Sequence, residues 1–145
     1  MSSAPRSALR DLSLDQRVDL ARVVMNVLDD WSVEGEDRVM LLGLPSDTKP
    51  RSLRRYREDT PFPDDEEVYA RIEHLIGIAD ALRTSFPRSI EAGAIWMKRR
   101  NARFDNRSPL RVMLEEGMGG IVYIRTHLDC AYDWHVSGST ITPSN

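Results

Sequence analysis

The sequence predicts a mainly α-helical protein made of two small helical lobes. Apolar residues recur three and four positions apart in several stretches, good N-cap residues precede these stretches, and Gly or Pro stands at their ends. A chain of 145 residues is long enough for one compact domain, or for two small lobes that share a core. With 41% hydrophobic and 30% charged residues, the composition is that of a folded globular protein and excludes a disordered or fibrous one.

Four helices are expected in the first half of the chain, after a loose polar segment over residues 1–12. A Ser-x-x-Gln capping box precedes the first helix, residues 14–30, whose apolar residues line one face. The second, residues 34–42, has acids in its first turn and a glycine at its end. The third, residues 48–57, has proline in its first turn, and the fourth, residues 64–86, opens with four acids and ends at a proline.

Three further helices are expected in the second half. A serine caps residues 90–100, where three cations near the end favour the negative pole of the helix. A Ser-Pro pair starts the helix over residues 110–116, and the glycine-rich residues 117–120 are interpreted as a flexible joint. Residues 121–134 keep helical spacing but are rich in β-branched side chains, so a short strand at their beginning stays open, and residues 135–145 are predicted to be a polar tail.

The charge balance limits the kinds of partner that the chain can bind. Its net charge of −3 excludes a protein coated in positive charge, so any contact with nucleic acid must come from a local basic patch, such as residues 49–57 or 98–111. The single cysteine, Cys130, allows no internal disulfide and gives no reason to expect an oxidising compartment. No stretch approaches the ~20 apolar residues of a membrane span, and none resembles a secretory signal. We therefore expect a cytoplasmic protein that makes no membrane contact.

Two short predicted helices joined by Gly43-Leu44-Pro45, the second rich in arginine, form the pattern of a helix-turn-helix. Such a basic helix can enter the major groove of DNA, where guanidinium groups reach phosphates and guanine edges. The alternative is a basic helix that only faces solvent, and the residues alone leave both open. The candidate DNA-binding residues are Lys49, Arg51, Ser52, Arg54, Arg55, Tyr56 and Arg57.

The sequence shows no catalytic, cofactor or metal site. His127, Cys130 and His135 are too few and too irregularly spaced for a structural zinc site. The glycines at residues 117–120 follow no predicted strand and precede no lysine, so they do not match a nucleotide-binding loop. No nucleophile, base and orienting acid can be grouped together, and we therefore expect no enzyme activity.

Large aromatic residues gather in the last third of the chain, among many arginines. Arginine and large aromatics anchor protein interfaces, but a small helical lobe also needs such bulk for its own core. Both interpretations stay open for these four residues: Trp96, Tyr123, Tyr132 and Trp134.

Together these motifs resemble the Xre/MbcA/ParS antitoxins, the partners of RES-domain toxins, over nearly the whole chain from about Asp15 to Trp134. One departure is the turn at residues 46–50, which is longer than in a typical Xre module. The segments that carry the resemblance are Asp30-Trp31, Leu41–Pro45, Arg54–Arg57, Arg71–Ile78, Ala81–Pro87, Trp96-Met97, Asn101, Phe104, Ser108–Leu110, Met113-Leu114, Gly117, Gly119-Gly120 and Arg125–Trp134.

The resemblance implies a helix-turn-helix domain over residues 13–87 and a toxin-binding and dimerisation domain over residues 88–134. It implies a homodimeric antitoxin that represses its own operon by binding operator DNA. It also implies that the chain covers the active-site cleft of a RES-domain toxin that degrades or uses NAD. The alternative is a dimeric helix-turn-helix transcription regulator with no toxin partner. The candidate toxin-binding residues are Trp96, Arg107, Ser108, Pro109, Leu110, Arg125, Asp129, Tyr132, Asp133 and Trp134.

Overall fold

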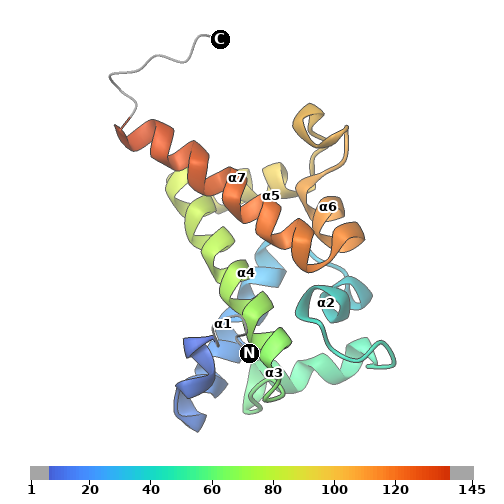
Figure 1. Cartoon of the computed structure of the whole chain (residues 1–145). Helices are drawn as coiled ribbons and strands as arrows, with labels where there is room; N and C mark the ends of the chain where they lie inside the picture. Colours follow the sequence, from blue (N-terminus) through green and yellow to red (C-terminus); the bar gives the residue numbers. More distant parts are fainter. Residues whose placement is uncertain (1–6, 138–145) are drawn as a thin grey trace, which may run out of the picture. The chain divides into compact units, whose positions relative to one another are not determined.

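A computed structural model describes residues 7–137 of the chain, with the side chains of residues 7–130. Within this range the chain forms α-helices and short 3-10 helices with no sheet, which confirms the predicted mainly α fold (Figure 1). The strand left open near residue 121 does not form, because one long helix covers that stretch. The described backbone contains one isolated antiparallel bridge, between Asn101 and Arg107. None of the described helices is long and apolar enough to cross a membrane.

The chain divides into two compact units, unit 1 (Met1–Ile76) and unit 2 (Gly77–Asn145), with the boundary inside helix α4. The domain boundary predicted from the sequence, between residues 87 and 88, stays a prediction. Unit 1 contains η1 (Ala8–Asp11), α1 (Leu14–Asp30), α2 (Gly35–Leu42), η2 (Pro50–Arg54), α3 (Arg55–Glu58) and the first part of α4 (Glu66–Ser85). Unit 2 contains the rest of α4, α5 (Ile90–Lys98), η3 (Ala102–Phe104), α6 (Pro109–Glu116) and α7 (Met118–Ser137).

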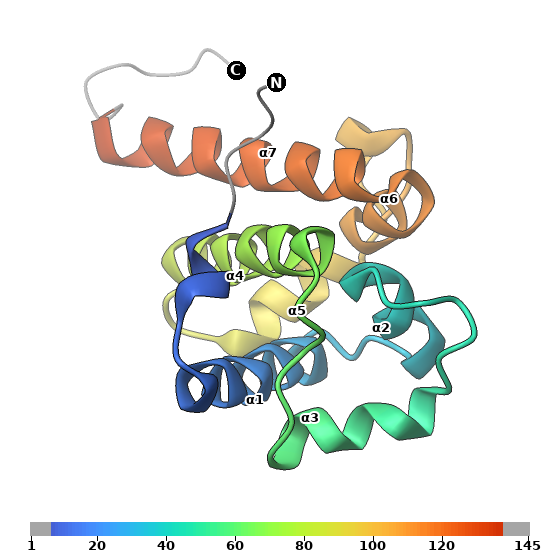
Figure 2. The same ribbon diagram turned by 60° about the horizontal axis from the view of Figure 1, so that its bottom comes forward.

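Helix α1 begins as its sequence predicts. The side chain of Ser13 accepts a hydrogen bond from the Gln16 amide at 3.1 Å, and the Gln16 side chain accepts one from the Ser13 amide at 3.0 Å. This capping box satisfies backbone donors that have no partner within the helix. The face that α1 buries packs against α3 in unit 1 (Figure 2) and consists of Ala21, Val24, Met25 and Leu28.

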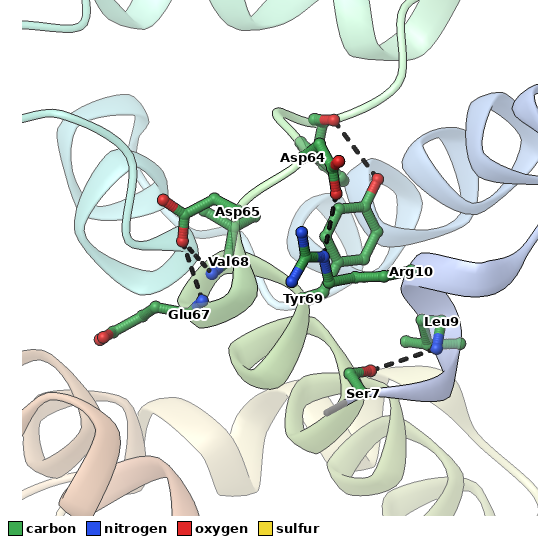
Figure 3. Close-up of polar contacts among 9 residues, drawn as sticks. Ser7, Leu9, Arg10, Asp64, Asp65, Glu67, Val68 and Tyr69 are labelled. Atoms are coloured by element: carbon green, nitrogen blue, oxygen red, sulfur yellow. Dashed lines mark hydrogen bonds and ion pairs between the residues drawn. The ribbon is translucent and has the colours of Figure 1, made fainter. Parts of the chain in front are cut away.

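The beginning of the described chain differs from the loose segment predicted over residues 1–12. Residues 8–11 form η1, and Ser7, which is 6% exposed, caps it by accepting from the Leu9 amide. Arg10 holds this turn to the start of α4 through an ion pair with Asp64 at 2.9 Å (Figure 3). Residues 1–6 lie outside the described residues. A hydrophobicity pattern cannot predict this segment, because a long-range ion pair and a cap hold it.

The turn between α2 and α3 depends on Gly43 and on an arginine from α4. Gly43 has φ +73°, a left-handed conformation that favours glycine, and it ends α2 as predicted. Arg71 donates to the Met40 carbonyl at 3.1 Å, where α2 leaves carbonyls without a helical partner. The third predicted helix begins two residues later than predicted and has two parts, the 3-10 helix η2 and then α3. It starts at Pro50, because proline favours the first helical position.

The predicted flexible joint at residues 117–120 is instead a tight corner between two helices. Gly117, with φ +65°, ends α6, and α7 begins at the next residue. An added Cβ at Gly120 would overlap the carbonyl oxygen of Val112 in α6, whereas at Gly119 it would meet no atom within 4 Å. Gly120 therefore lets α6 and α7 pack closely, side by side (Figures 1 and 2). Helix α7 continues to Ser137, which shortens the predicted tail; residues 138–145 lie outside the described residues.

Candidate functional site

The predicted DNA-binding residues lie on η2, α3 and the residue before them. Five of the seven are exposed, and four of these, Lys49, Arg51, Arg54 and Arg55, form no ion pair with another described residue. The fifth is Arg57, which pairs with Asp29. Ser52 is half-buried and donates to the Lys49 carbonyl oxygen at 2.7 Å. We call the four exposed cations without a described ion pair, Lys49, Arg51, Arg54 and Arg55, the basic helix surface.

The other two predicted residues of this set face the interior or an acid. Tyr56 is 8% exposed, and its ring lies 4.5 Å from the ring of Phe62. Arg57 forms a bidentate pair with Asp29, at 2.5 and 2.6 Å, and Arg38 lies 2.8 Å from the same carboxylate. Tyr56 and Arg57 therefore fix α3 to the rest of unit 1.

The charge-assisted hydrogen bonds from Arg57, followed by those from Arg38, lower the pKa of Asp29 from 3.8 to about 2. The Asp29 carboxylate therefore binds a proton more weakly in the folded state than in the unfolded state. The Asp29 carboxylate stabilises unit 1 at neutral pH, and this contribution is lost as the pH falls from about 4 toward 2.

In unit 2, four aromatic side chains from α5, η3 and α7 form one cluster around Phe104, which is 2% exposed. The Phe104 ring meets Trp96, Tyr123 and His127 edge-on, with centroids 6.3, 5.7 and 5.2 Å away. The ring of Trp96 stacks on His127 at 6.2 Å. We call Trp96, Phe104, Tyr123 and His127 the aromatic cluster.

One edge of the aromatic cluster faces solvent. Tyr123 is 50% exposed, and Trp96 and His127 are half-buried. Sequence neighbours on the same two helices are exposed apolar residues, Ile95 at 54% and Val122 at 37%. Exposed large aromatics beside cations are typical of the anchor residues of protein interfaces. The exposed cations nearest in sequence to the cluster are Lys98, Arg99, Arg100 and Arg103.

Burial in the cluster, followed by the positive charge of Arg103, lowers the pKa of His127 below its ordinary 6.5. His127 therefore becomes protonated at a higher pH in the unfolded chain than in the folded chain. As a result, the free energy of unfolding is expected to fall as the pH drops below about 6.5.

We expect His127→Gln to flatten that pH dependence between pH 7.5 and 5.5 in urea unfolding. His74 and His135 are present in both proteins, so the difference between the two curves isolates His127. Equal slopes for the wild type and the variant would contradict this assignment.

Four predicted toxin-binding residues, Arg107 to Leu110, shape the loop before α6. Ser108 caps α6 by accepting from the Arg111 amide at 3.0 Å, and the next two residues are buried: Pro109 and Leu110. Arg107 lies 3.2 Å from Glu115 and 2.9 Å from Glu116, and its Nε donates to the Phe104 carbonyl oxygen at 3.2 Å. These contacts hold Phe104 and the loop in place, a role that the sequence pattern did not indicate.

The remaining predicted toxin-binding residues lie along α7. The Nε of Arg125 is 3.7 Å from the Asp129 carboxylate, and Asp129 is exposed. Tyr132, Asp133 and Trp134 lie within the helical span of α7, but their side chains are outside the described ones.

Phe104, the central residue of the aromatic cluster, was not among the predicted toxin-binding residues, and neither were Tyr123 and His127. The family resemblance did include Phe104 and His127, and Tyr123 was an aromatic residue for which an interface and a core role both stayed open. The i, i+4 spacing of Tyr123 and His127 places both on one face of a helix and was a usable signal. Nothing in the local sequence places Phe104 between them. Among the side chains that the structure describes, no three His, Cys, Asp or Glu residues come together as metal ligands do.

Comparison with known proteins gives two matches. Residues 81–130 match the family model described as "Antitoxin Xre/MbcA/ParS C-terminal toxin-binding domain", and this range contains the whole aromatic cluster. The uncharacterized protein y4oB of Sinorhizobium fredii is 31% identical over 104 residues, which are 71% of this chain and 76% of that protein. No solved structure matches the chain significantly.

Proposed function

Because this chain belongs to the Xre/MbcA/ParS antitoxin family, we propose that it neutralises a RES-domain toxin, by covering the cleft in which that toxin degrades or uses NAD. The chain itself would perform no reaction and need no cofactor. It would also repress its own operon, as a homodimer that binds operator DNA.

One observation carries the toxin-binding part of this proposal: the segment that matches the toxin-binding domain is the segment that builds the aromatic cluster. Tyr123 combines a half-exposed ring with a rigid support, Phe104, so little conformational entropy is lost when a partner covers it. Burial of such a ring is typical of the residues that dominate binding energy.

We assign direct contact with the toxin to Trp96, Tyr123 and the exposed side of α7. Arg107 and Ser108, with Pro109 and Leu110, would act by holding the loop that carries Phe104. The α7 residues proposed to extend the contact toward the cleft of the toxin are Asp129, Tyr132, Asp133 and Trp134.

The proposed toxin can be tested by co-expressing the full chain with the product of the neighbouring gene. We expect cells that express the neighbour alone to stop growing and to lose NAD, and co-expression to restore both and to yield one complex in size exclusion. The proposal would be contradicted if the two proteins eluted separately at micromolar concentration and the co-expressing cells still lost NAD.

DNA binding is supported by the basic helix surface, which presents four cations, Lys49, Arg51, Arg54 and Arg55, within seven residues of an acidic protein. Cations that form no ion pair within the protein can replace the counterions of DNA phosphates. Tyr56 and Arg57 would hold α3 against the rest of unit 1.

Reversing two of these charges, in Arg54→Glu/Arg55→Glu, should lower the affinity for operator DNA by about two orders of magnitude at 0.15 M salt. It should also reduce the slope of log K against log[salt] by roughly two, because about two phosphate contacts are lost. Fluorescence anisotropy with the operator fragment measures both quantities.

The matched control is Arg83→Glu/Arg88→Glu, which changes the net charge equally on exposed residues of unit 2 and should leave DNA binding intact. Equal losses in both variants would point to overall charge and not to the basic helix surface. Toxin binding should survive the reversal at Arg54 and Arg55. A chain that binds operator DNA but no toxin would instead be a dimeric transcription regulator.

A further inference from the structure

The guanidinium group of Arg125 in α7 lies directly on the backbone of α4 at Gly77, within unit 2. A Cβ added to Gly77 would lie 2.5 Å from Nε and 2.8 Å from Nη2 of Arg125, much closer than van der Waals contact. Only glycine leaves room for the guanidinium at this position of α4.

The surroundings of Arg125 place it at the edge of the buried face of α7. Its side chain is 32% exposed, and its Nε is 3.7 Å from the Asp129 carboxylate one turn later on the same helix. Arg125 also follows Ile124, a fully buried residue of α7. It therefore stands at the edge of the buried face, where the direction of its side chain depends on how α7 is rotated about its own axis.

The aromatic cluster lies on the other side of α7. Each residue of an α-helix turns the chain by about 100°, so residues two positions from Arg125 point about 200° away from it. Those residues are Tyr123 and His127, the two members of the cluster that α7 supplies. Helix α7 is thus held on one side by Arg125 against Gly77 and on the other by Phe104.

We propose that Arg125 is a positioning residue for toxin binding: its contact with Gly77 sets the rotation of α7 and so the direction in which Tyr123 and His127 face the toxin. This inference rests on the proposed function. Arg125 would then affect toxin binding indirectly, through the orientation of α7. In the alternative, direct role, its guanidinium group would itself contact the toxin.

A double-mutant cycle with the full chain separates the two roles. Gly77→Ala and Arg125→Ala should each weaken toxin binding about tenfold, and the double variant should be no weaker than Arg125→Ala alone, because removal of the guanidinium frees the space that the methyl group needs. The cost of Gly77→Ala in stability should be small, since the atoms that must move belong to the end of a flexible side chain.

Gly93→Ala is the matched control. Gly93 lies inside α5, and an added Cβ there would be 3.5 Å from its nearest neighbour, the Cβ of Leu82, which is ordinary contact. Both substitutions add the same methyl group to a helix of unit 2, so Gly93→Ala should leave the toxin affinity unchanged.

The free chain provides a second readout that needs no toxin. In NMR spectra, Gly77→Ala should shift the ring signals of Tyr123 and His127, and Gly93→Ala should not. Unchanged ring signals in Gly77→Ala would overturn the inference. It would also be overturned if Gly77→Ala bound toxin normally while Arg125→Ala did not, or if the two losses added. If the wild-type chain bound no toxin, the proposed function would fail, and the ring signals would still decide whether Gly77 positions α7.

Discussion

Replacing Tyr123 by alanine should weaken toxin binding about thirtyfold, or ~2 kcal/mol, while the free chain stays folded. The side chain of Tyr123 is 50% exposed, so its removal deletes only part of a buried contact from the free chain. A toxin that covers Tyr123 would bury the exposed part as well, and the variant would lose that contribution to binding. Titration calorimetry gives the affinity, and circular dichroism checks the fold.

Val23→Ala is the control for this prediction, because Val23 is an apolar residue of unit 1 with a similar exposed fraction, 49%. It should bind toxin as the wild type does. Wild-type affinity in Tyr123→Ala would exclude the aromatic cluster as the centre of the interface. Equal losses in the two variants would show only that apolar surface in general contributes to binding.

Gly120→Ala should lower the free energy of unfolding by roughly 2–3 kcal/mol. The new Cβ would overlap the carbonyl oxygen of Val112 and lie 3.1 Å from its carbonyl carbon. These atoms belong to the backbone of α6, so the two helices must separate. A urea unfolding curve measures the loss.

The neighbouring Gly119→Ala supplies the control, because an added Cβ there meets nothing within 4 Å. Alanine favours a helix over glycine by about 1 kcal/mol, so this variant should be as stable as the wild type or slightly more stable. If both variants unfolded at the same urea concentration, residues 117–120 would be the flexible joint that the sequence suggested.

Local signals predicted most of the helices, because each helix start depends on a few neighbouring residues. The capping box at Ser13 and the Ser-Pro start of α6 both form as expected. The sequence could not reveal η1, which depends on the ion pair between Arg10 and Asp64. It also misjudged Gly120, because glycine in a joint and glycine at a helix contact look alike until the facing backbone is known.

The candidate sites were predicted less completely than the helices. A run of cations identified the basic helix surface, but charge patterning alone could not show that Arg57 pairs with Asp29, a residue 28 positions earlier. Likewise, the aromatic residues were visible in the sequence, yet their grouping around Phe104 is a tertiary contact between three separate elements. Family resemblance identified the segment that matches the toxin-binding domain, and the structure shows which of its described side chains are accessible.

The most direct test of toxin binding by unit 2 is hydrogen exchange of the full chain, measured by mass spectrometry with and without the toxin. We expect slower exchange upon binding in the peptides that cover residues 95–104 and 120–128, with residues 49–58 unchanged. Protection confined to residues 49–58, with the peptides of the aromatic cluster exchanging equally in both states, would contradict toxin binding through this surface.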